Sequence, residues 1–183
     1  MKKRLETRIE GDRIVLRPVR EDEFDVYFEL LQDAESNRLT GTQQTFTKDS
    51  IAAWIHNIGY AHEDRLDMMI AEKQSDELIG EVVLNEIDLN NRSGNIRISI
   101  SGRHSNKGYG TEALKLMLRY GFESLRLHRI ELGVYAFNPR AIHVYEKLGF
   151  VREGTLRDYL YWDGTFHDMI VMSILEEEFR QLP

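Results

Sequence analysis

A short loop with two glycines, Gly108 and Gly110, is the part of this sequence best suited to bind a ligand. The residues before it, 95–100, alternate between polar and apolar types, which is typical of a strand with one buried face. From Thr111 onward the apolar residues recur at helical spacing. A loop between a strand and a helix directs several backbone N–H groups and the positive end of the helix dipole at one point. This arrangement favours a bound phosphate, although an ordinary tight turn would also contain such glycines.

Spacing separates the phosphate-binding loops that this segment could form. A nucleoside-triphosphate P-loop requires Gly-x-x-x-x-Gly-Lys-Ser/Thr, and here Lys107 precedes its glycine, so this interpretation fails. Residues 108–113 do match the Gly-x-Gly-x-x-Gly/Ala pattern of dinucleotide-binding folds, and Glu131 lies near the expected distance for a ribose ligand. However, Glu131 begins a strand instead of ending one, and a central parallel strand would be continuously apolar. The dinucleotide interpretation is therefore disfavoured and is kept as an alternative.

The elements that must position this loop follow from periodicity and turn residues. Gly59 marks the end of a helix that Thr47 caps, and Asp163 and Gly164 form the turn of a final hairpin. A long crossover makes the strand at 130–135 parallel to the strand at 95–100. We predict an α/β (α+β) mixed sheet, mostly antiparallel with one central parallel pair, flanked by about four helices. The expected strands are 13–19, 67–72, 78–87, 95–100, 130–135, 151–161 and 165–175, and the expected helices follow residues 20, 47, 110 and 138.

The glycine loop resembles the pyrophosphate loop of GNAT-superfamily N-acetyltransferases, Arg/Gln-x-x-Gly-x-Gly/Ala. In that family the loop amides hold the pyrophosphate of acetyl-coenzyme A. The first position departs from the pattern, because Ser105 stands where Arg or Gln is usual. This removes a long side chain but no backbone donor, so we expect weakened binding and not lost binding. The resemblance implies these cofactor-binding residues: Ser105, Asn106, Lys107, Gly108, Tyr109, Gly110 and Thr111.

A second segment carries the same resemblance. Residues 138–150, Asn-Pro-Arg-Ala-Ile-His-Val-Tyr-Glu-Lys-Leu-Gly-Phe, resemble the second GNAT motif, Asn-x-x-Ser/Ala-x-x-x-Tyr-x-x-x-Gly-Phe. The resemblance covers residues 10–178. Segments 111–114, 129–132 and 154–157 look like the group that holds ribosomal-protein N-terminal (alanine/serine) acetyltransferases and spermidine acetyltransferases. It implies an enzyme that moves the acetyl group of acetyl-CoA directly to a primary amine in a ternary complex.

Attack of an amine on a thioester requires a positioned donor, a polarised carbonyl, a base and an acid. By resemblance, Tyr145 gives a proton to the departing thiolate, and a tyrosine of pKa ~10 is a credible donor. The pantetheine arm would lie along the central strand and pair with the backbone of Ile98, Ser99 and Ile100. Asn138 matches the Asn that contacts the cofactor in this family, although a helix N-cap also explains it.

The general base is the least specified part of the site. Many relatives carry a glutamate early in the central strand, where this sequence has Asn95. We predict that Glu86, at the end of the preceding strand, replaces it directly or through water. Glu81, Tyr135 and Asp168 are weaker candidates. The six histidines lack ligand spacing, so no metal is expected.

Composition limits the partners. The length of 183 residues with 42% hydrophobic content suits one domain over 1–183. A formal charge of −7 disfavours nucleic acid and permits a cationic amine. The acidic helix after residue 20, together with Glu35, Glu86 and Asp88, would suit a polyamine, a basic peptide N-terminus or an aminoglycoside-like cation. The absence of cysteine excludes disulfides and an acyl-cysteine intermediate on this chain.

Location and assembly are expectations of the same kind. The basic residues 1–4 precede no apolar run, and no segment approaches transmembrane length, so we expect a cytoplasmic protein that does not enter membranes. The resemblance also implies a homodimer formed through the final strands. The non-enzymatic alternative is a GNAT-like domain that senses acyl-CoA without turnover, and Asn95 and Ser105 leave this alternative open.

Overall fold

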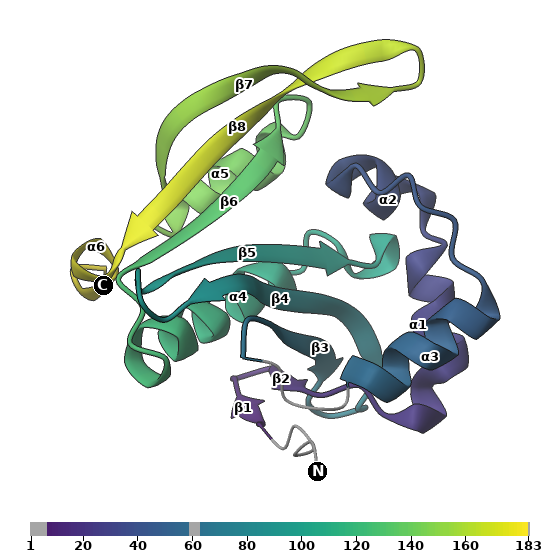
Figure 1. Ribbon diagram of the computed structural model, residues 1–183. Coiled ribbons are helices and arrows are strands. Elements are labelled where there is room, and N and C mark those ends of the chain that lie inside the picture. Colours follow the sequence, from purple (N-terminus) through teal and green to yellow (C-terminus); the bar gives the residue numbers. More distant parts are fainter. Residues whose placement is uncertain (1–6, 59–62, 183) are drawn as a thin grey trace.

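The computed structural model describes residues 7–58 and 63–182 (Figure 1). The expected helix end at Gly59 and the basic residues 1–4 lie outside the described residues. Among the residues that are described, no helix is both long and apolar enough to cross a membrane.

An eight-stranded sheet forms the centre of the molecule, in the order β1-β2-β3-β4-β5-β6-β8-β7. Every neighbouring pair is antiparallel except β5 and β6, which are parallel. This confirms the predicted mixed sheet with one parallel pair. The short β1 was not predicted. The strands are β1 (Ile9–Glu10), β2 (Ile14–Arg17), β3 (Leu66–Glu72), β4 (Leu78–Asp88), β5 (Ser93–Ile100), β6 (Arg129–Tyr135), β7 (Val151–Trp162) and β8 (Thr165–Leu175).

The described residues form six α-helices, two more than the sequence predicted. The additional helices are the polar α2 and the short, acidic α6, neither of which carries the long apolar stripe that sequence analysis detects. The predicted caps are confirmed at Thr47, whose Oγ1 accepts from Ser50 N at 3.2 Å, and at Asn138. The helices are α1 (Phe24–Leu31), α2 (Ala34–Thr40), α3 (Lys48–Ile58), α4 (Tyr109–Arg119), α5 (Pro139–Lys147) and α6 (Glu176–Arg180).

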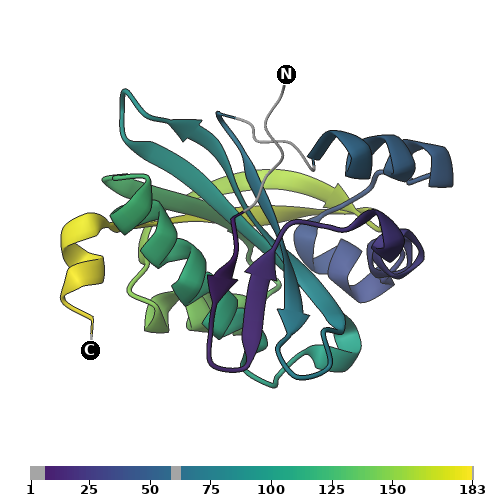
Figure 2. The ribbon, with the colours of Figure 1, turned by 90° about the horizontal axis from the view of Figure 1, so that it is seen from below.

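The sheet separates two apolar clusters. Figures 1 and 2 show the helices that cover its two faces. Helices α4 and α5 pack on one face, where Ile96 of β5 is 2% exposed and Met117 of α4 is fully buried. Helices α1 and α3 pack on the other face, around Tyr27 and Met69. Because side chains alternate along a strand, Ser99 of β5 lies on the α1–α3 face. The two faces of β5 can therefore serve different chemical purposes.

The parallel pair β5–β6 is short. It joins Ser93 to Arg129, Gly94 to Ile130 and Asn95 to Glu131, and beyond these residues the two strands do not pair with each other. Both strands continue, because β4 still pairs with β5 as far as Ile100 and β8 still pairs with β6. Figure 1 shows β5 and β6 diverging from this junction. The edge of β5 from Ile96 to Ile100 is consequently left without a strand partner, and we call this opening the β5–β6 gap.

Gly80 holds β4 unusually close to the free part of β5. A Cβ at Gly80 would collide with the carbonyl oxygen of Ser99 and would lie 3.1 Å from the Cα of Ile100. These are backbone atoms in a paired strand, so they cannot move away without a shift of β5 itself. A residue without a side chain is therefore required at this position.

We predict that Gly80→Ala lowers the free energy of unfolding by about 2–3 kcal/mol, because the added methyl overpacks a rigid backbone contact. Gly154→Ala is the matched control: this strand glycine has nothing within 4 Å of its would-be Cβ, and its substitution should change stability by less than about 0.5 kcal/mol. Urea unfolding of both variants measures the difference. Equal stability of the two variants would contradict the close approach of β4 to β5.

Candidate functional site

The backbone of β5 presents hydrogen-bonding groups to the β5–β6 gap. Ser101 N donates to Ile79 O at 3.0 Å, so Ser101 faces β4. Alternate residues of an antiparallel strand face opposite neighbours, so Ser99 also faces β4, whereas the N–H and C=O groups of Ile98 and Ile100 face the gap. Of the three residues expected to pair with an extended ligand, Ile98 and Ile100 thus offer backbone groups, and Ser99 offers its side chain on the α1–α3 face.

Helix α2 lies across the open end of the gap. Ser36 Oγ donates to Ile100 O at 3.0 Å, which joins α2 to β5. Gly41, the left-handed C-cap of α2 with φ 66°, lies against the ring of Tyr135 at the end of β6, where a Cβ would collide with that ring. Tyr135 also stacks on Phe137 with ring centroids 5.5 Å apart. Tyr135, a weaker candidate for the base, is thus part of the wall at this end of the gap.

The glycine loop follows β5 and leads into α4. Asn106 and Gly108 adopt the left-handed conformation, with φ 62° and 84°. Gly108 is the N-cap of α4, and no side chain of the described residues caps the first turn. The first N–H groups of a helix have no intrahelical acceptor, so those of Tyr109, Gly110 and Thr111 remain available to a ligand. Lys107 and Gly108 are exposed to solvent.

A hydrogen bond connects this loop to α5 on the other side of the gap. Arg140 Nη1 donates to Asn106 Oδ1 at 3.0 Å. Ser105 contributes no long side chain, and its Oγ reaches only the carbonyl oxygen of Ser101, at 3.5 Å. Asn138 Oδ1 accepts from Ala141 N at 3.1 Å, so its expected role as an N-cap is confirmed. The loop and the start of α5 therefore bracket the same end of the gap.

Tyr145 lies on α5, half-buried against the cluster of α4 and α5. Its ring meets Phe150 edge-on, with centroids 5.8 Å apart, and burial raises the pKa of its hydroxyl to about 12. Among the described residues, Asn85 Oδ1 is the only side-chain polar atom both buried and unpartnered. The Tyr145 hydroxyl also makes no hydrogen bond to the described residues, but it is not among the fully buried atoms, so solvent reaches it.

The candidate bases differ in their surroundings. Glu86 is exposed at an irregularity of β4, with φ 53°, and makes no recorded ion pair within the described part of the chain. Asp168 Oδ1 accepts from Asp158 N at 2.9 Å, which supports a bulge of the β7–β8 hairpin. Glu81 pairs in register with Ser99, and its Oε2 accepts from the Tyr27 hydroxyl at 2.7 Å. Glu81 is thus the candidate base that the strand register places opposite Ser99 of β5.

The carboxyl group of Glu81 is held in a defined environment. The Tyr27 ring stacks on Trp54 with centroids 4.9 Å apart, which fixes the hydroxyl that donates to Glu81. Burial is the main cause that raises the pKa of Glu81, and the negative Asp67 adds to it, whereas Tyr27 and Arg97 act in the opposite direction. Sequence reasoning ranked this residue below Glu86 because α1, far away in the chain, supplies the burial.

Two of the acidic residues expected to attract a cationic amine are engaged locally. Glu35 binds Arg38 within α2, with both side-chain bonds at 3.1 Å. Asp88 accepts from the backbone N–H groups of Asn90 and Asn91 in the turn before β5. Within residues 7–58 and 63–182, no group of three or more His, Asp or Glu side chains could hold a metal ion.

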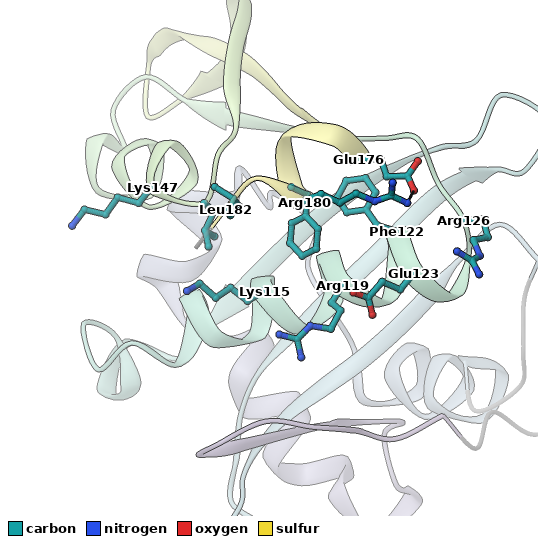
Figure 3. Close-up of a pocket in the computed structure, with 11 residues that line it drawn as sticks. Lys115, Arg119, Phe122, Glu123, Arg126, Lys147, Glu176, Arg180 and Leu182 are labelled. Carbon is teal, nitrogen blue, oxygen red and sulfur yellow. Dashed lines mark hydrogen bonds and ion pairs between the residues drawn. The ribbon is translucent and has the colours of Figure 1, made fainter.

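Two cavities of about 480 Å³ each lie outside the gap. One lies between α2 and the turn of the β7–β8 hairpin, and Asn37, Gln43 and Trp162 contribute to its lining. The other lies between the second half of α4 and α6, with cationic side chains around Phe122 (Figure 3). Neither cavity contains a residue that the sequence predicted for the site.

Comparison with known proteins identifies relatives. Residues 13–151 match the family described as "Acetyltransferase (GNAT) domain". The chain is 35% identical over 120 residues to spermidine N(1)-acetyltransferase of Vibrio cholerae serotype O1, covering 66% of this chain and 69% of that protein. It is 34% identical over 103 residues to the putative ribosomal N-acetyltransferase YdaF of Bacillus subtilis, covering 56% of each. A crystal structure of spermidine N-acetyltransferase from Vibrio cholerae in complex with CoA and spermine superposes with a TM-score of 0.85 at 27% identity, covering 92% of this chain and 99% of that one.

We predict that Glu81→Gln stabilises the protein at about pH 8 and has a smaller effect at about pH 5. A carboxyl group whose pKa rises on folding contributes stability below its unfolded pKa and loses that contribution as the pH rises through its folded pKa. Glutamine keeps an acceptor for Tyr27 and carries no charge. Urea unfolding at the two pH values measures the effect, with the exposed Glu86→Gln as the control. A Glu81→Gln variant less stable than wild type at the higher pH would contradict the buried carboxylate.

Proposed function

The chain belongs to the GNAT acetyltransferase family, and we propose that its acceptor is a polyamine, to which it transfers the acetyl group of acetyl-CoA in a ternary complex. The observation that carries this proposal is the β5–β6 gap, to which Ile98 and Ile100 present backbone N–H and C=O groups that pair with no strand of the described residues. The uncapped start of α4 follows β5, and the half-buried Tyr145 lies on α5 against the same apolar cluster as α4. Acetyl-CoA supplies a thioester whose carbonyl carbon accepts the amine.

In this proposal the backbone holds the donor. The N–H and C=O groups of Ile98 and Ile100 pair with the amide groups of the pantetheine arm in the manner of an added strand. The loop from Ser105 to Thr111 receives the pyrophosphate on the backbone N–H groups at the start of α4. Asn138 uses its Oδ1 for capping, and its side-chain amide nitrogen makes no hydrogen bond to the described residues. Side-chain identity in β5 matters little for this binding, because main-chain atoms perform it.

The acid and the base lie on opposite faces of the sheet. Tyr145 belongs to the face of α4 and α5, and a hydroxyl with a pKa of about 12 stays protonated at neutral pH, ready to donate to a thiolate. Glu81 lies on the α1–α3 face beside Ser99 and accepts the proton that the attacking amine loses. We propose Glu81 for this role ahead of Glu86, because the Tyr27 hydroxyl positions Glu81, whereas Glu86 is exposed and makes no hydrogen bond or ion pair with the described residues.

The choice of a polyamine rests on chemistry and on similarity. A protonated amine beside the Glu81 carboxylate would offset part of the desolvation that raises the pKa of this group, which favours binding of a cationic amine over a neutral one. The relatives named above include an enzyme that acts on spermidine and a structure that holds spermine. The similarity to a putative ribosomal acetyltransferase favours a protein N-terminus as the competing acceptor. An acyl-CoA sensor would bind the donor but release no thiol.

We also propose that the chain forms a homodimer through β7. This strand is twelve residues long and has a free edge, because β8 pairs with only one side of it. The hairpin exposes Tyr159, Tyr161 and Phe166, each with more than half of its surface accessible. A long, apolar, unpaired edge favours association with another strand. Measurement of the molar mass in solution by light scattering tests this proposal.

The single domain over residues 1–183 and the cytoplasmic location remain predictions from the sequence.

We predict that spermidine and spermine, but not peptides with free N-termini, release thiol from acetyl-CoA.

Tyr145→Phe should slow this turnover by about 100-fold without weakening acetyl-CoA binding, because it removes only a proton donor. Tyr120→Phe is the matched control, since Tyr120 packs half-buried against the same apolar cluster. Thiol release with peptides alone would replace the polyamine by a protein acceptor. Donor binding without turnover on any amine would establish the sensor.

We predict that Glu81→Gln lowers kcat by about 100-fold, whereas Glu86→Gln leaves it unchanged. The acid limb of the pH profile of kcat/KM should disappear in Glu81→Gln, because the amide cannot accept the amine proton. Thiol release measured across the pH range for both variants decides between the two carboxylates. Loss of that limb in Glu86→Gln instead would return the role of base to Glu86.

A further inference from the structure

Arg13, in the N-terminal part of the chain, contacts the glycine loop. It precedes β2, and its Nη1 donates to Lys107 O at 2.9 Å, although the two residues are 94 positions apart. Its guanidinium lies 4.8 Å from the centroid of the Tyr109 ring. A Cβ at Gly108 would lie 2.9 Å from Arg13 Nη2. The guanidinium therefore contacts three consecutive residues at the point where the loop becomes α4.

Glu112 fixes the position of Arg13. In the first turn of α4, Glu112 Oε1 accepts from Arg13 N at 2.9 Å, and Oε2 accepts from Arg13 Nε at 3.3 Å. The carbonyl oxygen of Arg13 accepts from Lys73 N at 2.8 Å. Backbone and side chain of Arg13 are thus both held to the surrounding elements, which leaves the guanidinium little freedom to move away from the loop.

Part of the guanidinium remains available to a ligand. Arginine has five N–H donors, and the recorded hydrogen bonds of the Arg13 side chain use only Nε and Nη1. Within the described part of the chain, Nη2 has no acceptor, and about half of the side chain (52%) is exposed. The free Nη2 lies against Gly108, beside the uncapped N–H groups of α4. An anion bound by those N–H groups would meet a fixed cationic fork.

We propose that Arg13 binds the pyrophosphate of acetyl-CoA and supplies the long cationic side chain that the loop lacks at Ser105. This inference rests on the proposed function, because it concerns the same donor. Guanidinium forks match phosphate oxygens and make strong charge-assisted hydrogen bonds. The nearby Arg140 is already engaged with Asn106 Oδ1, and the Ser105 hydroxyl is directed to Ser101 O. The Nη2 group of Arg13 accordingly lies at Gly108 with its donors unused by the described residues.

Three donors test the proposal by calorimetry: acetyl-CoA, its dephospho form, which lacks only the 3′-phosphate, and acetyl-pantetheine, which lacks the pyrophosphate together with the adenosine. Arg13→Ala should weaken acetyl-CoA and the dephospho form equally, by about 10- to 100-fold, and leave acetyl-pantetheine unchanged. Arg13→Lys should recover part of the loss, because charge remains and the fork does not.

Arg8→Ala is the matched control. Arg8 precedes β1 of the same hairpin, is 53% exposed and binds Glu10, so its removal takes away the same charge without touching the loop. It should bind all three donors as wild type does.

Three results would overturn the inference. The first is unchanged affinity of Arg13→Ala for acetyl-CoA. The second is an equal loss of affinity for acetyl-pantetheine, which would assign Arg13 to loop folding alone. The third is a loss of affinity confined to acetyl-CoA, which would assign Arg13 to the 3′-phosphate. Failure of the wild-type protein to bind acetyl-CoA would instead overturn the proposed function itself.

Discussion

The loss of pairing between β5 and β6 after Asn95 and Glu131 is the feature on which the rest of the site depends. The N–H and C=O groups of a strand edge need hydrogen-bond partners, and among the described residues α2 contacts this edge only at the carbonyl of Ile100, through Ser36. The remaining groups are directed at a space that no strand of the described residues fills. The amide groups of an extended ligand can form hydrogen bonds with these backbone groups. Acetyl-CoA, the donor used by the family to which the chain belongs, has such amide groups in its pantetheine arm.

The opening can persist because each diverging strand is held on its other side. β4 stays paired with β5 as far as Ile100, and Gly80 allows the two backbones to approach closely. β8 pairs with the whole of β6, and the apolar cluster of α4 and α5 packs beneath both strands. The energy of the sheet and the core is thus largely independent of the missing pairs. This arrangement separates the part of the molecule that provides stability from the part that binds.

The polar groups of the site come from distant parts of the chain. Tyr27, stacked on Trp54, donates to Glu81, and Arg13 reaches the loop before α4. Each of these contacts joins the N-terminal third of the chain to a strand or loop of the centre. The N-terminal elements therefore do more than cover the sheet, since they also place polar groups at Glu81 and at the loop before α4.

The sequence by itself determined the sheet, the glycine loop, the parallel pair and the helix that carries Tyr145, because periodicity, caps and turn residues act over a few positions. It did not reveal α2, whose residues show no apolar stripe and whose place depends on Ile100 and Tyr135. It also ranked Glu86 above Glu81, because desolvation of Glu81 arises only when α1 packs on β4. Only the tertiary structure decides which groups of β5 face the gap and which distant side chains reach it, since these are contacts between segments that are remote in sequence.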